Sequence, residues 1–516
     1  MSEITFLGAA QTVTGSRHLL RTNAGQRILV DCGMFQGLKS LRDRNWHGLG
    51  VTPTDIDAVL LTHAHLDHCG WLPRLVSAGY RGRIYCTPGT RDLCSLVLPD
   101  AGRIQEEDAR QANKHGYTKH RPALPLFTED DARRALTLMQ PVSFEVPLPI
   151  VPGVTAEFIR AGHLLGSSFI RVTQEDEGRT ILFGGDLGRY DRPVLPDPTS
   201  MEEADVLLVE STYGNRTHAP DDDGAMIAEV VVRTHERGGR LVIPSFAIGR
   251  VEEVLYWLQR LEKEARIPSM PTYVDSPMAA EALAFYSSRP DELDPDMRPV
   301  HRGPMFDTRR LHVIKDTEES KALTRSTGPA IIISASGMAT GGRVLHHLKQ
   351  MLPDDRNTVM FVGFQAPGTR GRSLVDGADT VKIHGEVIPV NARVVKNDQM
   401  SAHADRHEIL RWLRGFKRPP AHTFLVHGEP DAMGVLAETI HRELGWTVHQ
   451  PQHKERVDLA SGRHPRVRRV AARVGQAGPA GTAGPTGTAG PTGDGQAAPS
   501  VGPAVPARPI GPTEAS

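Results

Sequence analysis

Short runs of aliphatic residues recur along the chain, and each run ends in a polar or charged residue. Such runs are typical of buried strands, whose carboxyl ends often carry functional side chains. The stretches at 249–265 and 342–352 instead have apolar residues at helical spacing. Alternating strands and helices predict a layered α/β protein. The predicted strands lie at 27–31, 58–63, 180–186, 205–210, 240–245, 330–336 and 423–427.

The length and composition indicate a multidomain protein with a balanced charge. Because 516 residues exceed one average domain, we expect two substantial globular domains. The formal net charge is -1, which excludes nucleic-acid binding by bulk positive charge alone. The segment 474–516 is rich in Gly, Pro and Ala and lacks large apolar side chains. We therefore predict a disordered C-terminal tail.

The spacing of the cysteines and the hydropathy of the chain indicate in which cellular compartment the protein is expected. The four cysteines have the spacing of neither a zinc-binding pair nor a dense disulfide framework, which is typical of a reducing cytoplasm. The N-terminal residues do not resemble a secretion signal, and no run of about 18 apolar residues occurs. We expect a soluble, unexported cytoplasmic protein without membrane contact.

Four residues of metal-ligand type follow the predicted strand at 58–63, in the order His63, His65, Asp67 and His68. A regular strand or helix cannot aim all four at one point, whereas a loop at a strand end can direct them toward two metal ions. With 23 histidines in 516 residues, this HxHxDH pattern is expected about 0.003 times by chance. Ordinary surface or core histidines therefore explain it poorly.

Three further residues of ligand type lie at strand ends or in Gly-flanked loops: His163 in RAGHLLGSS, Asp186 in LFGGDLG and His427 in FLVHGEP. Each is weak evidence alone, because a single His or Asp at a strand end is more often a satisfied loop residue. Together with the first cluster they supply imidazole and carboxylate but no thiolate. This set suits catalytic zinc with room for water, and it also accepts manganese.

These motifs resemble those of the β-CASP nuclease family of metallo-β-lactamase-fold hydrolases. The resemblance implies a four-layer αββα sandwich with an inserted α/β β-CASP domain and two Zn²⁺ per subunit. It also implies that Asp31, at the end of RILVDCG, orients a ligand histidine. The implied ligands are His63, His65 and His163 for one metal, Asp67, His68 and His427 for the other, and Asp186 between them.

A long insertion distinguishes this chain from small metallo-β-lactamase-fold enzymes. About 190 residues separate Glu210, in LLVESTYGNR, from His403, in SAHADRHEI, which is enough for a separate domain. The predicted segments are 1–210 and 396–465 for the metallo-β-lactamase domain, 211–395 for the β-CASP domain and 474–516 for the tail.

The resemblance also assigns catalytic roles, because Glu210, His403 and His427 match the family's motifs A, B and C. Two metal ions about 3.5 to 4 Å apart produce hydroxide from water near neutral pH and neutralise a scissile phosphate. Asp67 is therefore counted as catalytic as well as a ligand. His403 is the predicted proton donor, with its imidazole held by Glu210. Two structural alternatives stay open: His403 as a helix-start residue capped by Ser401, and Glu210 as a fold-stabilising carboxylate.

The nature of motif C bears on the substrate. DNA-processing relatives typically have a nonpolar residue where this chain has His427, so the resemblance favours single-stranded RNA. We predict an endoribonuclease similar to bacterial relatives of the eukaryotic pre-mRNA 3'-end cleavage subunit, because the region after the catalytic unit is Pro/Gly-rich instead of a folded domain like that of ribonuclease J. A 5'-3' exoribonuclease, a thioester or lactone hydrolase and a noncatalytic RNA-binding scaffold are the alternatives. A homodimer is expected by analogy.

Substrate contacts are predicted in the inserted domain. The segment ISASGMATGGRVLHHL at 333–348 places small residues before a predicted helix, whose N–H groups would hold a phosphate. An ordinary capped helix fits this segment equally well, and the basic stretch at 406–418 is predicted to be an amphipathic helix. The predicted RNA-binding residues are Ser336, Gly341, Gly342 and Arg343, with Gln365, Arg370 and Arg372 as weaker candidates.

Overall fold

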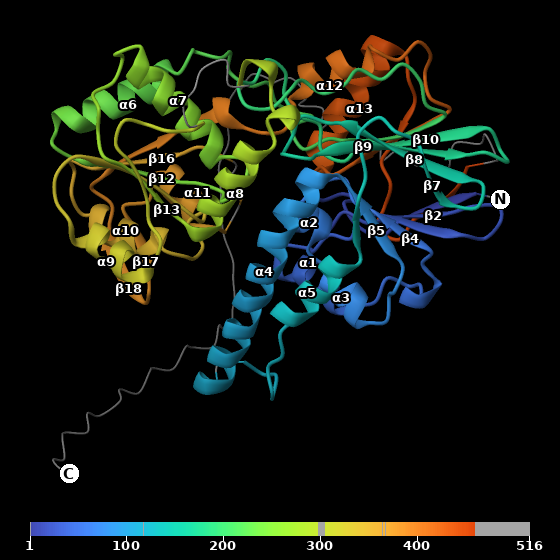
Figure 1. Ribbon diagram of the computed structural model, residues 1–516, viewed down its shortest axis with the longest axis horizontal. Coiled ribbons are helices and arrows are strands. Elements are labelled where there is room, and N and C mark those ends of the chain that lie inside the picture. Colours follow the sequence, from blue (N-terminus) through green and yellow to red (C-terminus); the bar gives the residue numbers. More distant parts are fainter. Residues whose placement is uncertain (1, 117, 298–304, 364, 367, 460–516) are drawn as a thin grey trace, which may run out of the picture. The chain divides into compact units, whose positions relative to one another are not determined.

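The computed structural model describes residues 2–116, 118–297, 305–363, 365–366 and 368–459 (Figure 1). All seven predicted strands form. The helices predicted at 249–265, 342–352 and 406–418 are present as α7 (Val251–Lys263), α10 (Val344–Met351) and α12 (Arg406–Leu413). The tail predicted at 474–516 lies outside the described residues. Within the described ranges, each helix is too short or too polar to cross a membrane.

Two seven-stranded sheets pack face to face through apolar side chains that are buried on both inner faces, such as Phe6, Leu60, Phe158, Phe183 and Phe424. The first sheet has the order β22 (Arg456–Asp458), β1 (Glu3–Phe6), β2 (His18–Arg21), β3 (Arg27–Val30), β4 (Ala58–Leu60), β5 (Arg83–Cys86) and β6 (Met139–Pro141). The second has the order β21 (Val448–His449), β20 (His422–Val426), β11 (Val206–Glu210), β10 (Arg179–Phe183), β9 (Ser168–Gln174), β8 (Val154–Arg160) and β7 (Leu148–Val151).

Helices cover the outer face of each of these two sheets. On the first sheet, Leu72 and Leu93 belong to the cluster that buries Val59; on the second, Trp412 and Leu436 belong to the cluster that buries Leu207. The predicted four-layer αββα sandwich is therefore confirmed. The helices of the first sheet are α1 (Lys39–Arg42), α2 (Leu66–Cys69), α3 (Leu72–Ser77), α4 (Pro88–His115) and α5 (Glu129–Thr137), and those of the second are α12 (Arg406–Leu413) and α13 (Pro430–Leu444).

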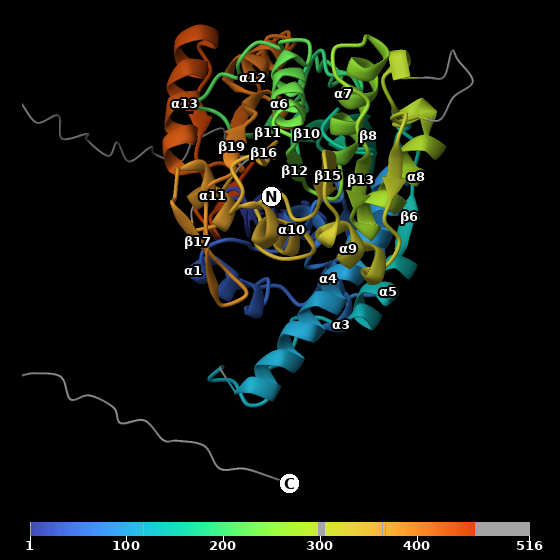
Figure 2. The ribbon, with the colours of Figure 1, turned by 90° about the vertical axis from the view of Figure 1, so that its left-hand side faces the viewer.

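A third sheet has six strands, all paired in parallel. Helices cover both of its faces (Figure 2), which explains why its strands are apolar on both sides. Its order is β14 (Leu311–Val313), β13 (Thr272–Asp275), β15 (Ala330–Ser334), β12 (Arg240–Pro244), β16 (Thr358–Phe361) and β19 (Arg393–Lys396). One face packs on α6 (Ala225–Glu236), α7 and α8 (Pro277–Ser288), and the other on α9 (Thr317–Arg325), α10 and α11 (Arg370–Val375).

Strand pairing identifies the third sheet as an insertion into the sandwich. β11 and β20 are parallel neighbours, with Glu210 opposite Val426, although the whole third sheet lies between them in sequence. The predicted boundaries at 210 and 395 stay predictions. A hairpin of β17 (Thr380–Ile383) and β18 (Glu386–Pro389) completes the inserted part. The 3₁₀ turns are Asp43–Trp46, Pro53–Asp55, Pro290–Glu292, Pro295–Met297 and Asp398–Met400.

Candidate metal centre

The seven predicted ligands converge from four segments, each of which follows the carboxyl end of a strand. After β4, His63 and His65 lie in a loop as expected, whereas Asp67 and His68 lie in the short helix α2 that follows it. The loops after β8, β10 and β20 carry His163, Asp186 and His427. His427 has a left-handed backbone with φ of 49°, and so does Asp31, with φ of 59°, at the end of β3. Strained residues of this kind concentrate at functional sites, where they turn a side chain sharply at a strand end.

One group of ligand atoms consists of His63, His65, His163 and Asp186. Nδ1 of His65 lies 3.2 Å from Nε2 of His63 and 3.2 Å from Nε2 of His163. Oδ2 of Asp186 lies 3.4 Å from both of those Nε2 atoms. Four ligands at about 2.0 to 2.1 Å from a tetrahedral zinc lie about 3.3 to 3.4 Å from one another. These four distances therefore fit a single tetrahedral metal ion.

A second group consists of Asp67, His68 and His427. Nε2 of His427 lies 3.2 Å from Oδ2 of Asp67, and Nε2 of His68 lies 3.9 Å from the same oxygen. The other oxygen of Asp186, Oδ1, lies 3.3 Å from Nε2 of His68. Asp186 therefore presents one oxygen to each group, which is the geometry of a bridging carboxylate.

Two buried polar atoms test whether cations fit here. Within the described residues, Nε2 of His68 and Oδ1 of Asp186 are buried and have no hydrogen-bond partner. Leaving such atoms unpaired is costly. Both face the second ligand group, where a cation would satisfy them. The orphaned atoms and the imidazole–carboxylate donor set fit a pair of divalent cations.

The ring nitrogens that face away from the ligand groups have partners in the protein. Nδ1 of His68 lies 2.7 Å from Oδ2 of Asp31, and Nδ1 of His163 lies 3.1 Å from the carbonyl oxygen of Ala402. These contacts place the N–H on Nδ1 and leave the lone pair on Nε2 for a metal. Thr62 and Thr212 contact Nδ1 of His63 and His427 at 3.1 and 3.0 Å.

Sequence reasoning missed Thr62, Thr212 and the carbonyl of Ala402. The only available signal was adjacency: Thr62 precedes His63, Thr212 lies two residues after Glu210, and Ala402 precedes His403. Threonine and alanine are common residues, so this adjacency has little predictive value.

The backbone of Asp67 and His68 is fixed by the segments that precede β2 and follow β3. The N–H groups of Ser16 and Cys32 donate to the carbonyls of Asp67 and His68, both at 2.7 Å. Gly33 makes this approach close enough, because a Cβ at that position would lie 1.6 Å from the carbonyl oxygen of Asp67. The side chains of Asp67 and His68 are therefore positioned by a packed backbone.

His403 and Glu210 lie at the edge of the first ligand group. Nδ1 of His403 lies 3.1 Å from Oε2 of Glu210 and 3.8 Å from Oδ2 of Asp186. Glu210 is fully buried and also accepts hydrogen bonds from the backbone N–H of Leu187, at 2.7 Å, and from the hydroxyl of Thr212. Hydrogen-bond donors of the protein therefore occupy both carboxylate oxygens of Glu210, whereas Oδ1 of Asp186 has no hydrogen-bond donor. This contrast favours Glu210 as a support for His403 over Glu210 as a ligand.

Electrostatics favour the charged form of His403. Burial alone would lower the pKa of His403, but the adjacent carboxylates of Glu210 and Asp186 outweigh it and raise the pKa to about 9. Cations in the ligand groups would lower this value by repulsion. The alternative of a helix start capped by Ser401 is wrong, because α12 begins at Arg406 with Asp405 as its N-cap.

The predicted RNA-binding residues lie in the inserted domain. Nη1 of Arg343 donates to Oδ1 of Asp275 at 2.8 Å, and Ser336 bonds within its own loop to Thr340. Gln365 is only 3 % exposed, and its Nε2 donates to backbone carbonyls, so it supports the loops. The remaining candidates are Gly341 and Gly342 in the loop before α10, and Arg370 and Arg372 in α11, where Arg370 donates to the carbonyl of Lys382 and Arg372 pairs with Asp376.

The fold and this centre define a metal-dependent hydrolase of the metallo-β-lactamase superfamily, and the chain belongs to the β-CASP family of ribonucleases within it. Three family models match: the metallo-beta-lactamase superfamily over residues 15–98, the Beta-Casp domain over 251–374, and the Zn-dependent metallo-hydrolase RNA specificity domain over 387–451.

Several relatives are similar over most of their length. Ribonuclease TTHA0252 of Thermus thermophilus is 40% identical over 438 residues, which cover 84% of this chain and 94% of the relative. Transcription termination factor FttA of Methanocaldococcus jannaschii is 30% identical over 88% of this chain and 71% of its own. An RNase J-like protein of the same organism is 30% identical over 86% of this chain and 96% of its own.

A solved structure, of a protein of unknown function from Enterococcus faecalis V583, matches 88% of this chain and 99% of its own with a TM-score of 0.51. At 14% identity this match concerns the fold alone.

Proposed function

We propose that the protein is a ribonuclease that uses two Zn²⁺ ions per subunit to hydrolyse single-stranded RNA endonucleolytically. The observation that carries this proposal is the pair of ligand groups that share Asp186, with the His403–Glu210 pair beside them. His63, His65 and His163 would hold one ion, and Asp67, His68 and His427 the other. The proposal includes a cytoplasmic location and a homodimer, both of which rest on analogy.

The residues divide the chemistry between them. Divalent cations, when bound, supply Lewis acidity that lowers the pKa of water and neutralises phosphate charge. His403 has Nδ1 turned to Glu210, so Nε2 is the nitrogen that donates a proton to the leaving oxygen. Glu210 keeps the imidazole oriented and favours its charged form. Asp31 holds His68 in the tautomer that leaves Nε2 open.

RNA is the substrate that the similarities favour. The RNA specificity model covers residues 387–451, which include both His403 and His427. A relative named as a ribonuclease aligns over most of both chains. A thioester or lactone hydrolase would leave the inserted sheet and the His403–Glu210 pair without a role. A noncatalytic scaffold would not need the spacing of the two ligand groups.

Circular RNA separates the two modes of cleavage, because it has no ends for an exonuclease. Bound metal is quantified by mass spectrometry, and the protein is then incubated with circular RNA, end-labelled linear RNA and matched DNA. We expect about two zinc ions per chain and cutting of both RNA forms. Cleavage of linear RNA alone would indicate an exonuclease, and cleavage of DNA without RNA would contradict the substrate class.

Paired variants test the assignment of the site. Asp67→Ala and His403→Ala should abolish or strongly reduce cutting, whereas Asp130→Ala, on the exposed face of α5, should not. Activity of Asp67→Ala equal to that of Asp130→Ala would contradict a role for the second ligand group.

A further inference from the structure

The carboxyl edge of the third sheet is a second place where loops from different strands meet. In doubly wound sheets, ligands bind at this edge, where neighbouring strands connect in opposite directions. β12 and β16 are such neighbours: the chain leaves β12 toward β13 and leaves β16 toward β19, on the other side of the sheet. The loops after β12, β15 and β16 therefore border one position at this edge.

Phe246 lies in the loop after β12, at this position. Among the phenylalanines that the structure describes, it alone is exposed, with 39 % of its surface accessible. The rest of its surface is covered by the protein, so the ring is packed on one side and accessible on the other.

The ring of Phe246 packs against two glycines. A Cβ at Gly337, in the loop after β15, would lie 2.9 Å from Cδ2 of Phe246. A Cβ at Gly363, after β16, would lie 3.2 Å from Cε2. One edge of the ring therefore lies directly on the backbone of both neighbouring loops, which limits its movement.

Gln365 ties these two loops together. Its Nε2 donates to the carbonyl of Gly337 at 3.0 Å and to the carbonyl of Gly363 at 3.1 Å. The buried amide of Gln365 thus connects, by hydrogen bonds, the two loops on which the ring of Phe246 packs. A ring held in this way loses little conformational entropy when it binds a partner.

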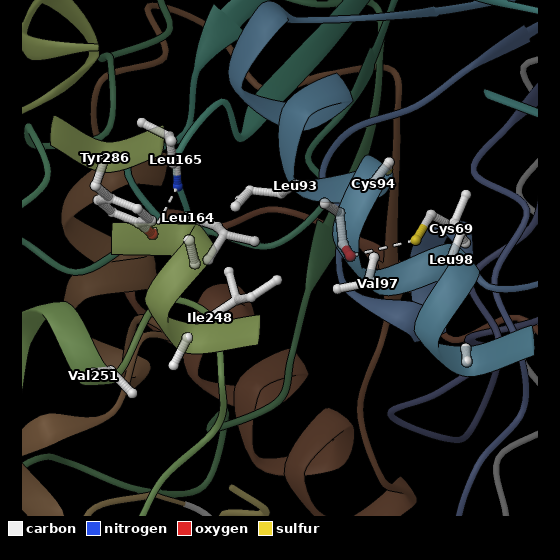
Figure 3. Close-up of a cluster of buried hydrophobic side chains, with 14 of the residues drawn as sticks. Cys69, Leu93, Cys94, Val97, Leu98, Leu164, Leu165, Ile248, Val251 and Tyr286 are labelled. Carbon is white, nitrogen blue, oxygen red and sulfur yellow. Dashed lines mark hydrogen bonds between the residues drawn. The ribbon is translucent and has the colours of Figure 1, made fainter. Parts of the chain in front are cut away.

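The loop that carries Phe246 also reaches the metal centre. Gly249, three residues further on, lines a cavity of about 30 Å³ together with His163, and a Cβ at Gly249 would lie 2.5 Å from Cδ1 of Leu164. Figure 3 shows Ile248 beside Leu164, and both belong with Val251 to one cluster of buried side chains. Three residues span at most about 10 Å, so Phe246 lies within that distance of Gly249 at this cavity.

We propose that Phe246 is a base-stacking residue for the RNA strand, a role that rests on the proposed function. Every base has a π-face, so a single aromatic platform accepts any sequence. The net charge of -1 makes such a contribution important, because bulk electrostatic attraction supplies little affinity. The ring lies beside the loop that carries Ser336 and Arg343, so a base and its phosphate would be held by neighbouring groups.

Abasic substitution tests this contact directly. Single abasic nucleotides are placed in turn along a short single-stranded RNA around its cleavage site, and KM and kcat are measured with the full-length wild type and with Phe246→Ala. In the wild type, one position should raise KM at least about fivefold. In Phe246→Ala, KM for intact RNA should rise by the same factor, and the abasic position should add nothing.

Further variants separate stacking from folding. Phe246→Trp should retain the wild-type KM, whereas Phe246→Leu should behave like Phe246→Ala, because leucine is apolar but has no π-face. Val387→Ala, at a position 68 % exposed on β18, is the matched control and should change nothing. Bound metal and kcat should stay at wild-type values in all four variants.

The outcomes distinguish this role from the proposed function. If the wild type cuts no RNA, the proposed function fails and the stacking role falls with it. If the wild type cuts RNA but the abasic position costs the same in Phe246→Ala, the stacking role alone is wrong. If Phe246→Ala changes the molecular mass in light scattering while KM is unchanged, the ring belongs to a protein interface and the proposal is overturned.

Discussion

The metal centre and the carboxyl edge of the third sheet are both built from loops that follow strands, but they are built differently. At the metal centre, His63, His68, His163 and Asp186 are at most 2 % exposed, and two of their polar atoms face one another without hydrogen bonds. At the edge of the third sheet, glycine backbone and one exposed ring form the surface. The first arrangement fixes polar atoms in place, and the second would offer an aromatic surface to the proposed RNA strand.

This difference predicts where substitutions act. Changes at the metal centre should remove catalysis because each atom has a single geometric role. Changes at the third sheet should weaken binding by smaller factors, because contacts to a nucleic-acid backbone are many and individually modest.

The largest effect is expected for Asp186→Asn, which keeps the shape of the side chain and removes its charge. Because its two oxygens face different ligand groups, both cations should bind poorly. Metal ions supply several kcal/mol of transition-state stabilisation, so the cleavage rate should fall by about 10³-fold or more. Metal content and rate are measured together, with Asp130→Asn as the control. Full occupancy with a normal rate would remove Asp186 from the centre.

His403→Ala should lower the rate by about 10²-fold or more, as expected for loss of a general acid. The donor must be protonated, so wild-type activity should fall as pH rises through the pKa of His403, at or below about 9. Glu210→Gln removes the carboxylate that raises this pKa and leaves the burial that lowers it. The alkaline limb of the pH–rate profile should therefore move to lower pH.

A matched substitution controls for loss of charge: Glu202→Gln, on the exposed pair with Lys417, should leave the profile unchanged. If the alkaline limb of the pH–rate profile stays in place in Glu210→Gln, or persists in His403→Ala, a group other than His403 donates the proton to the leaving oxygen.

Asp31→Asn should act through His68 without touching a metal. The amide retains a hydrogen-bond acceptor for Nδ1 of His68 but loses the charge that strengthens the contact. Substitutions of this kind cost about 10- to 100-fold in metal affinity. Competition with a chelator measures the affinity, and Asp57→Asn, at an exposed position that accepts from the backbone of Arg27, is the control. Equal affinities would show that Asp31 supports only the fold.

The seven predicted strands form because most of them are buried on both faces, as Ala330–Ser334 is, and therefore have an unmistakable apolar composition. The predicted ligands lie close together in two groups, and their number in the sequence was the signal, because a single His or Asp at a strand end is ordinary. Their role as ligands stays a prediction. Strands such as β6 (Met139–Pro141) were missed because their sequence has no such pattern and pairing with β5 alone defines them.

The direction of side chains was less predictable. Gln365 was predicted to contact RNA, but it is buried, since a polar residue in a glycine-rich loop can face either way. The helix predicted at 406–418 forms as α12, and its capping box of Asp405 and Glu408 rules out the alternative of a helix start at Ser401. Phe246 was not identified, because one Phe after a strand is ordinarily a core residue.

The smallest effect is expected for Arg343→Gln, and salt dependence is the measurement that detects it. Asp275 accepts from one nitrogen of Arg343 and also contacts His347 and Ser320, so the guanidinium is held in place at the loop before α10. Loss of one phosphate contact to a single strand should reduce the slope of log affinity against log salt by about 0.7. Arg356→Gln removes the same charge at a position 63% exposed, and it should leave the slope unchanged. If both variants shift the slope equally, Arg343 contributes only to the overall positive charge and makes no specific phosphate contact. RNA binding at this edge would then depend on the ring of Phe246 and the loop backbone.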